Sequence, residues 1–180
     1  MSRRGVQIVL LCEDQQQEVF MRRFLKRYGY RNDQIRHRFS PKGKQSGEQF
    51  VRTNYPIELK AYKSKAAYVS IGFVVMIDAD LRTVDARIQE LDEACDMQNT
   101  PRRSPQDRVS IFVPKRNIET WIYYLDGKSI NETMSYQKLQ SPSECEPAVA
   151  RLAEICQSQH VPVDFPNSLE RACEEFQKIR

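Results

Sequence analysis

The sequence lacks the features that mark membrane proteins and the common nucleotide-binding loops. No apolar run approaches the roughly 18 residues of a membrane-spanning helix, so we expect no membrane partner. The apolar run at 6–12 stops at Glu13 and Asp14 without a small-residue cleavage site, which is unlike a signal peptide. The chain has only 6 glycines, and neither GxxxxGKS/T nor GxGxxG occurs. This absence excludes the two commonest phosphate-cradling loops.

Histidine is scarce, and the cysteines show no metal-binding spacing. The 2 histidines, His37 and His160, are far apart, and there is no CxxC motif. These absences exclude a zinc-finger spacing and, with no GxSxG present, argue against a Ser-His-Asp hydrolase. The 5 cysteines are scattered and odd in number, which favours reduced thiols and a cytoplasmic location. They are Cys12, Cys95, Cys145, Cys156 and Cys173.

Charge is distributed unevenly along a chain whose 180 residues allow one domain and at most a small appendage. The net charge is +4. Residues 1–65 hold 15 Lys/Arg against 6 Asp/Glu, which gives +9, whereas residues 66–180 hold 13 against 18, which gives −5. This asymmetry indicates nucleic acid or another phosphate-bearing ligand. A solvated basic face is the alternative.

Apolar runs and helical spacings alternate along the sequence. Apolar runs predict strands at 6–12, 69–77 and 108–113, and a short basic segment at 34–39 is expected to form a further strand. Apolar residues three and four apart predict helices at 15–28, 47–65, 83–96, 118–125, 142–159 and 167–179. We expect the second helix to be interrupted before Pro56 and the last to be capped by Asn167 or Ser168. The alternation predicts an α/β fold, with a mostly parallel sheet of about four strands flanked by helices.

Acidic residues follow three of the predicted strands. Glu13 comes after the first, Asp78 and Asp80 after the third, and Glu119 after the fourth. If these strands are parallel and adjacent, the carboxylates converge on one edge of the sheet, with Asp78 and Asp80 on the same side. Oxygen ligands of this kind suit a hard divalent cation such as Mg²⁺. Acidic residues are also common in solvated loops, but three in this order favour a metal site.

This arrangement resembles the TOPRIM (topoisomerase–primase) family, which carries a Glu after its first strand and Asp-x-Asp after a later one. Here Glu13 and the pair Asp78 and Asp80 match. The sequence is most similar to OLD-type nuclease TOPRIM domains and to small stand-alone TOPRIM proteins of bacterial anti-phage systems. Glu18 matches their second Glu, and Asn117-Ile118-Glu119-Thr120-Trp121 matches their segment after the fourth strand. The resemblance covers residues 5–125 well and the remainder loosely.

One position departs from the family pattern. Asp14 follows Glu13, where the family usually has Gly to let a phosphate or metal approach the backbone. The additional carboxylate leaves two interpretations open, a further ligand or an altered site.

The resemblance implies a compact Rossmann-like TOPRIM fold with metal-dependent phosphodiester chemistry. It implies a TOPRIM-like α/β domain at 1–128 and a helical extension packed on it at 129–180. The implied cofactor is Mg²⁺ or Mn²⁺, and the implied catalytic residues are Glu13, Asp78, Asp80 and Lys115. The implied metal ligands are Glu13, Glu18, Asp78, Asp80 and Glu119.

Substrate contacts are expected from the basic residues near these motifs. The candidates for binding nucleic acid are Arg22, Arg23, Lys26, Lys42, Lys44 and Arg116. For any one of them an exposed, solvated side chain is the simpler interpretation, so only the group indicates binding. Trp121 is expected to be buried against the sheet rather than to stack on a base.

Three functions compete on this evidence. The first is a metal-dependent nuclease acting on DNA, in preference to RNA, as the effector subunit of an anti-phage defence complex. Because the chain lacks the ABC-type ATPase joined to OLD-type domains, the resemblance implies a separate ATPase partner. The second is a catalytically inactive TOPRIM module that binds nucleic acid or a protein. The third is a small phosphatase or nucleotide hydrolase.

Overall fold

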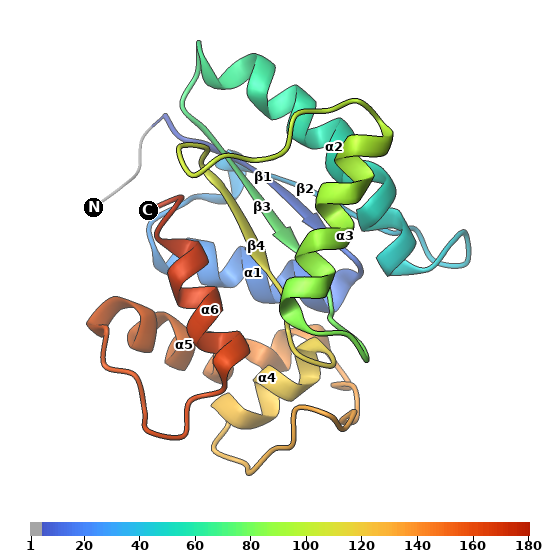
Figure 1. Cartoon of the computed structure of the whole chain (residues 1–180). Helices are drawn as coiled ribbons and strands as arrows, with labels where there is room; N and C mark the ends of the chain where they lie inside the picture. Colours follow the sequence, from blue (N-terminus) through green and yellow to red (C-terminus); the bar gives the residue numbers. More distant parts are fainter. Residues whose placement is uncertain (1–4) are drawn as a thin grey trace.

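The four predicted strands form one parallel sheet in the computed structural model, which describes residues 5–180 (Figure 1). In this range the sheet has four strands in the order β2-β1-β3-β4. They are β1 (Gln7–Cys12), β2 (Ile35–Phe39), β3 (Ile71–Met76) and β4 (Val109–Phe112). The α/β fold and the parallel sheet are confirmed. Residues 1–4, which belong to the expected 1–128 domain, lie outside the described residues.

Helices connect the strands and continue after the last one. The α-helices are α1 (Gln15–Arg27), α2 (Gly47–Ala66), α3 (Val84–Met97), α4 (Ile118–Leu125), α5 (Glu146–Ser158) and α6 (Asn167–Phe176). Short 3-10 helices, η1 (Asn32–Gln34) and η2 (Pro142–Cys145), precede β2 and α5. Across residues 5–180, no helix combines the length and the apolar character needed to cross a membrane.

The two faces of the sheet are covered by different helices (Figure 1). Because side chains alternate along a strand, Val9 and Leu11 of β1 face α2 and α3, whereas Ile8 and Leu10 face the opposite layer. That opposite layer contains α1, α4, α5 and α6 in one continuous apolar core. Trp121 of α4 is fully buried there, as expected. The sheet is therefore buried on both faces along β1, β3 and β4, which explains why these three strands are almost uniformly apolar, whereas the edge strand β2 exposes Arg36 and His37.

The strand order places a switch point between β1 and β3. The chain leaves β1 through α1 to reach β2 on one side, and leaves β2 through α2 to reach β3 on the other. Connections that depart in opposite directions open a crevice beyond the carboxyl ends of the two strands, where open parallel sheets bind their ligands. Glu13 follows β1 and Asp78 lies just beyond β3, so both occupy this position.

Three expectations about local structure are wrong. Pro56 does not interrupt its helix, because α2 runs unbroken and buries Tyr55, Pro56 and Leu59 as one packed face. Packing of this face offsets the backbone hydrogen bond that proline cannot donate. Neither Asn167 nor Ser168 caps the last helix, since Pro166 holds the N-cap position.

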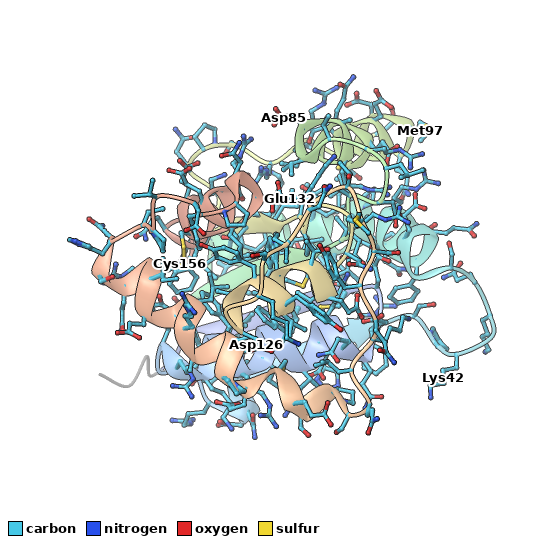
Figure 2. All side chains as sticks on the ribbon, turned by 90° about the horizontal axis from the view of Figure 1, so that it is seen from below. Lys42, Asp85, Met97, Asp126, Glu132 and Cys156 are labelled. Carbon is cyan, nitrogen blue, oxygen red and sulfur yellow. A yellow bond between two sulfur atoms is a disulfide. The ribbon has the colours of Figure 1, made fainter. Side chains whose placement is uncertain are left out.

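The third wrong expectation concerns the thiols, which are not all reduced. Cys156 of α5 and Cys173 of α6 form a disulfide, whereas the other three cysteines are free and buried. Figure 2 shows the sulfur–sulfur bond beside the label of Cys156. Because α5 and α6 lie together in the second layer, cysteines 17 positions apart come within bonding distance.

Candidate functional site

Glu13 and Asp78 meet at the carboxyl end of the sheet and are held together by Gln17. The backbone N–H of Asp78 donates to Oε1 of Glu13 at 2.6 Å. The side-chain amide of Gln17 donates to Oδ1 of Asp78 at 2.9 Å, and its Oε1 accepts from the backbone N–H of Glu13 at 3.0 Å. Gln17 is fully buried. One oxygen of each carboxylate is thus anchored, and the other oxygen has no hydrogen bond among the described residues.

Asp14 and Gly47 fix the position of Glu13 from opposite directions. Asp14 is the N-cap of α1, and its side chain accepts from the backbone N–H of Gln17 at 3.0 Å. Asp14 therefore has a structural role at the place where the TOPRIM pattern has Gly. On the other side, a Cβ on Gly47 would lie 2.6 Å from Cβ of Glu13, so only glycine allows α2 to begin this close.

Four carboxylates lie close together at this edge of the sheet, and none of them has an ion pair within residues 5–180. They are Glu13, Asp14, Asp78 and Glu119. Burial raises the pKa of Asp78 well above its usual range, and the charges of Glu13 and Glu119 raise it further. Burial also raises the pKa of Glu13 to about 7, against the effect of the hydrogen bond from Asp78. The pKa of Glu119 is raised first by burial and then by the charge of Asp14.

Asp80 lies on the other side of the sheet edge, and the expectation that it shares a side with Asp78 is wrong. Its backbone has a φ of 53°, in the left-handed region, so strand alternation no longer applies after Asp78. The carboxylate of Asp80 accepts from Arg87 of α3 at 3.2 Å, whereas Asp78 contacts Gln17 of α1. Helices α1 and α3 cover opposite faces of the sheet.

The remaining predicted metal ligands and Lys115 differ in how close they come to Asp78. Glu119 is near enough for its charge to act on Asp78. Glu18 is buried but pairs with Arg22 at 2.7 Å and lies 3.5 Å from Nδ1 of His37. The ammonium of Lys115 donates to the backbone carbonyl of Arg82 at 2.5 Å. The metal and catalytic roles of these three residues stay predictions.

The basic residues fall into two groups, one on α1 and one on loops. Arg22, Arg23 and Lys26 line a hollow of about 360 Å³ on α1, together with Arg27 and Glu146. Glu146 neutralises part of this group, because it pairs with both Arg23 and Arg27.

The second group is divided between two loops, which follow the opposite edge strands β2 and β4. Lys42 and Lys44 are exposed on the loop before α2, and Figure 2 shows Lys42 at its outer tip. Arg116 lies between β4 and α4 with a φ of 71°, and its carbonyl accepts from the backbone N–H of Asp80 at 3.0 Å. The role of both groups in binding nucleic acid stays a prediction.

Two residues that the sequence pattern does not single out complete the site. Gln17 could be recognised in the sequence by the spacing Asp14-x-x-Gln17. This spacing is typical of a capped helix start, in which the glutamine side chain hydrogen-bonds to the backbone just before the helix. Arg87 carries no such signal, because a lone arginine in a helix rich in charged residues is expected on the surface. Its side chain is instead fully buried.

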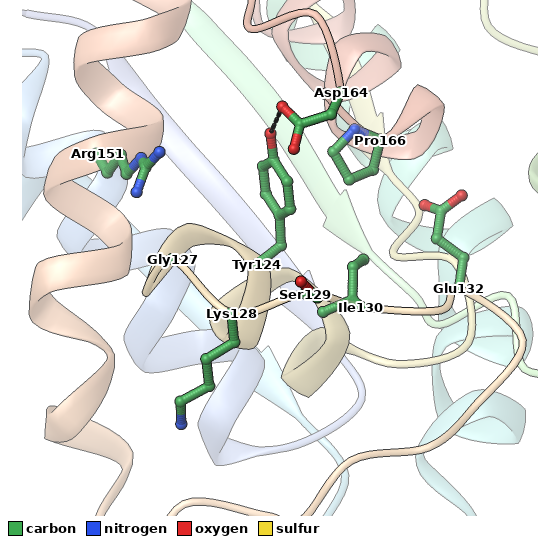
Figure 3. A pocket seen from close by; sticks show the side chains of 9 residues that line it. All are labelled: Tyr124, Gly127, Lys128, Ser129, Ile130, Glu132, Arg151, Asp164 and Pro166. Atoms are coloured by element: carbon green, nitrogen blue, oxygen red, sulfur yellow. Dashed lines mark hydrogen bonds between the residues drawn. The ribbon is translucent and has the colours of Figure 1, made fainter.

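A further hollow lies away from these carboxylates. It measures about 470 Å³ and is open between the end of α4, the start of α6 and Arg151 of α5 (Figure 3). Tyr124 donates a hydrogen bond to Asp164 at its rim, at 3.3 Å. None of the predicted metal ligands lines it, so its size does not make it part of the candidate site.

Comparisons with known proteins give no evidence for or against the candidate site. No protein-family model, no curated protein and no solved structure matches the chain.

Proposed function

We propose that this protein is a metal-dependent nuclease of the TOPRIM type that hydrolyses phosphodiesters with Mg²⁺ or Mn²⁺. The observation that carries the proposal is the group of four carboxylates, centred on Glu13 and Asp78 and without an ion pair among residues 5–180, at the switch point of a parallel sheet. Repulsion among buried carboxylates is relieved either by protonation or by a bound cation. Nucleic acid is the proposed substrate because the cations of α1 and of the loop before α2 lie on elements adjoining this edge.

The donor set fits a hard divalent ion. Within the described part of the chain, Glu13 and Asp78 each have one oxygen fixed by a hydrogen bond and one without a hydrogen bond. Carboxylate oxygens are the ligands that Mg²⁺ prefers. Among residues 5–180, no three acidic, histidine or cysteine side chains are already close enough to hold an ion. A site of two carboxylates suits Mg²⁺, which usually keeps several waters and takes its other ligands from substrate phosphate.

The residues around the pair have separate tasks in the proposed reaction. A bound ion would polarise the phosphodiester and lower the pKa of a water. Gln17 orients Asp78, and the packing of Gly47 orients Glu13. The other carboxylates, Asp14 and Glu119, maintain the negative charge that attracts the ion. The positive charge of α1 and of the loop at Lys42 and Lys44 would hold the backbone of the substrate by its phosphates.

The biological setting is the part of the proposal that rests on the TOPRIM resemblance alone. That resemblance favours an effector subunit of an anti-phage defence complex, located in the cytoplasm and working with a separate ABC-type ATPase. Adding the purified chain to such an ATPase, when one is encoded beside it, and assaying cleavage with and without ATP tests this part. Cleavage that is unchanged by every neighbouring ATPase would remove the partner from the proposal.

Cleavage assays on the isolated chain test the chemistry. Plasmid DNA, single-stranded DNA and structured RNA are each incubated with the protein in Mg²⁺, in Mn²⁺ and in EDTA. We expect cleavage only with metal, and we expect Glu13→Ala and Asp78→Ala to abolish it while circular dichroism shows a folded protein. Asp85→Ala, which alters an exposed carboxylate of α3, is the matched control and should cleave normally. Metal-dependent cleavage that survives both site substitutions would refute the assignment.

A second candidate function is a catalytically inactive module that binds nucleic acid or a protein. The contact of Asp80 with Arg87 favours it, because one carboxylate of the TOPRIM pattern is already neutralised by an internal cation. This function predicts nucleic-acid binding that is unaffected by EDTA, with no cleavage alone or with a partner. A gel-shift titration with and without EDTA, run beside the cleavage assay, separates the two functions.

A further inference from the structure

Arg87 is a fully buried cation that connects both aspartates of the Asp78-Ala79-Asp80 turn. Its Nε donates to the backbone carbonyl of Asp78 at 2.9 Å, and its Nη2 donates to Oδ2 of Asp80 at 3.2 Å. Its Nη1 donates to Glu48 of α2 at 2.7 Å and to Glu90 of α3 at 2.6 Å. One guanidinium therefore joins α2, α3 and the end of β3.

The surroundings of Arg87 form a balanced set of charges. A buried guanidinium is tolerated only when its donors are paired, and three of its four hydrogen bonds here go to carboxylates. Glu48 also lies 3.4 Å from Arg52, and Glu90 lies 2.5 Å from Arg82. The three carboxylates are thus matched by three arginines, and this cluster needs no further cation.

The neighbouring carboxylates, those of Glu13 and Asp78, differ from this cluster in their charge balance. Glu13 and Asp78 have no ion pair in the part of the chain that the structure describes, although the charges of Asp80 and Arg87 both reach Glu13. At this sheet edge the carboxylate of Asp80 is paired with Arg87, whereas those of Glu13 and Asp78 have no ion pair among residues 5–180. Glu13 and Asp78 therefore retain the unbalanced negative charge that draws in a metal ion.

We propose that Arg87 occupies the place of a second metal ion, so that the site binds one divalent cation through Glu13 and Asp78, with Asp80 held by Arg87 instead of by metal. Arg87 is a positioning residue in this arrangement, because it holds the backbone of Asp78 and the side chain of Asp80. The inference rests on the proposed function, and it names the ion count and the ligands of that site.

Calorimetric titration of the full chain with MnCl₂ tests the ion count and the ligands without measuring activity. We expect one ion per wild-type chain. Asp80→Asn should keep an affinity within about fivefold of wild type, since it changes only a half-exposed partner of Arg87. Asp78→Asn should weaken binding by more than about 100-fold, because it removes a ligand instead of a supporting group.

These outcomes distinguish the two proposals. Mn²⁺ binding that is unchanged in Asp78→Asn would contradict the proposed function. Two ions bound by the wild type, or an Asp80→Asn loss equal to that of Asp78→Asn, would overturn the role of Arg87 and leave the nuclease proposal standing.

Substitution of Arg87 itself gives the direct test. Arg87→Met leaves three carboxylates without their central cation, so we expect it to bind a second Mn²⁺. Arg87→Lys keeps the charge and should bind one ion, as should Arg171→Met, which removes an exposed arginine outside this cluster. A folded Arg87→Met chain that binds one ion with wild-type affinity would refute the proposal. If circular dichroism shows that Arg87→Met does not fold, the number of ions bound by the wild type and the affinity of Asp80→Asn for Mn²⁺ test the proposal instead.

Discussion

Gly47 shows how one small residue controls the position of a candidate ligand. It is the first residue of α2, where its backbone is helical and alanine would ordinarily be preferred by about 1 kcal/mol. The position nevertheless faces Glu13, with 2.6 Å between an added Cβ and Cβ of Glu13 and 2.8 Å to the carbonyl oxygen of Glu13. Contacts this short with backbone cannot be relieved by rotating a side chain. Glycine is therefore required by space and not by backbone conformation.

We predict that Gly47→Ala weakens Mn²⁺ binding by about 10-fold, because Glu13 or the start of α2 must shift. It should also lower the free energy of unfolding by about 1–3 kcal/mol, against the helix propensity of alanine. Titration calorimetry and urea denaturation measure the two effects. Gln49→Ala, an exposed change in the same helical turn, is the control and should alter neither. A Gly47→Ala chain that is more stable than wild type and binds Mn²⁺ equally well would contradict the steric argument.

Residue by residue, the sequence predicts the candidate site only in part. Glu13 and Asp78 could be found because each follows an apolar run, and parallel adjacent strands bring such residues together. The direction of Asp80 could not, because it depends on a left-handed backbone that alternation does not foresee. Arg87 could not either, since its burial depends on carboxylates from three separate segments.

At the scale of elements, α6 protects the exposed edge of the sheet at β4. An edge strand has backbone groups that no neighbouring strand satisfies. Here the N–H of Ile111 donates to Oε2 of Glu175 at 2.9 Å, and the hydroxyl of Ser110 donates to the Glu175 carbonyl at 2.6 Å. Arg103 donates to the same carboxylate and to the carbonyl of Val109, at 2.5 and 3.2 Å. Side chains of a helix and a loop thus replace a missing strand.

We predict that Glu175→Ala lowers the free energy of unfolding by about 3–5 kcal/mol, because it leaves the mostly buried Arg103 without its partner. Urea denaturation at pH 7 measures this, with the exposed neighbour Glu174→Ala as the matched control. Equal free energies of unfolding for the two variants would contradict the stabilising role of Glu175 as the partner of Arg103.

The same carboxylate gives the prediction a pH dependence. Burial alone would raise the pKa of Glu175, but hydrogen bonds from Arg103 and Lys178 outweigh it and lower the pKa below 4.5. Since the folded chain then binds the proton less readily than the unfolded chain, this stabilisation is complete above about pH 4.5 and is lost on further acidification. The difference between wild type and Glu175→Ala should therefore shrink below that pH. A difference that grows on acidification would contradict the assigned pKa.

Helices and their bounds could be predicted where the local sequence pattern determines the structure. They could not be predicted where packing against distant residues determines it. The helix at 118–125 is found at its predicted bounds, because Asn117 caps it and its apolar spacing is regular. Pro56 is a poor guide, since the buried face of α2 holds the helix continuous through it. The disulfide of Cys156 with Cys173 follows from the packing of α5 against α6, which scattered cysteines with no motif do not indicate.

For the whole molecule, the layer of α1, α4, α5 and α6 joins the first part of the described chain to the C-terminal helices in one core. The hydroxyl of Tyr28, at the end of α1, donates to the carbonyl of Ala153 in α5 at 2.9 Å. Tyr30 donates to the carbonyl of Ile179 at 2.8 Å, and Trp121 donates to Ser168 of α6 at 2.9 Å. Together with the apolar contacts of the same layer, these bonds make residues 129–180 an integral part of the core that covers the sheet.

We therefore predict that a chain ending at residue 128 does not fold independently, although the sequence suggests a domain boundary there. Removing α5 and α6 uncovers Phe24, Trp121 and the lower face of the sheet, and each large apolar side chain left exposed costs about 1.5–3 kcal/mol. Urea denaturation followed by circular dichroism should show no cooperative transition for residues 1–128. Co-expression with residues 129–180 is the control, and it should restore the transition because the missing layer is supplied. A fragment 1–128 that unfolds cooperatively, with a free energy of unfolding within about 2 kcal/mol of the full chain, would instead make the C-terminal helices a separable extension.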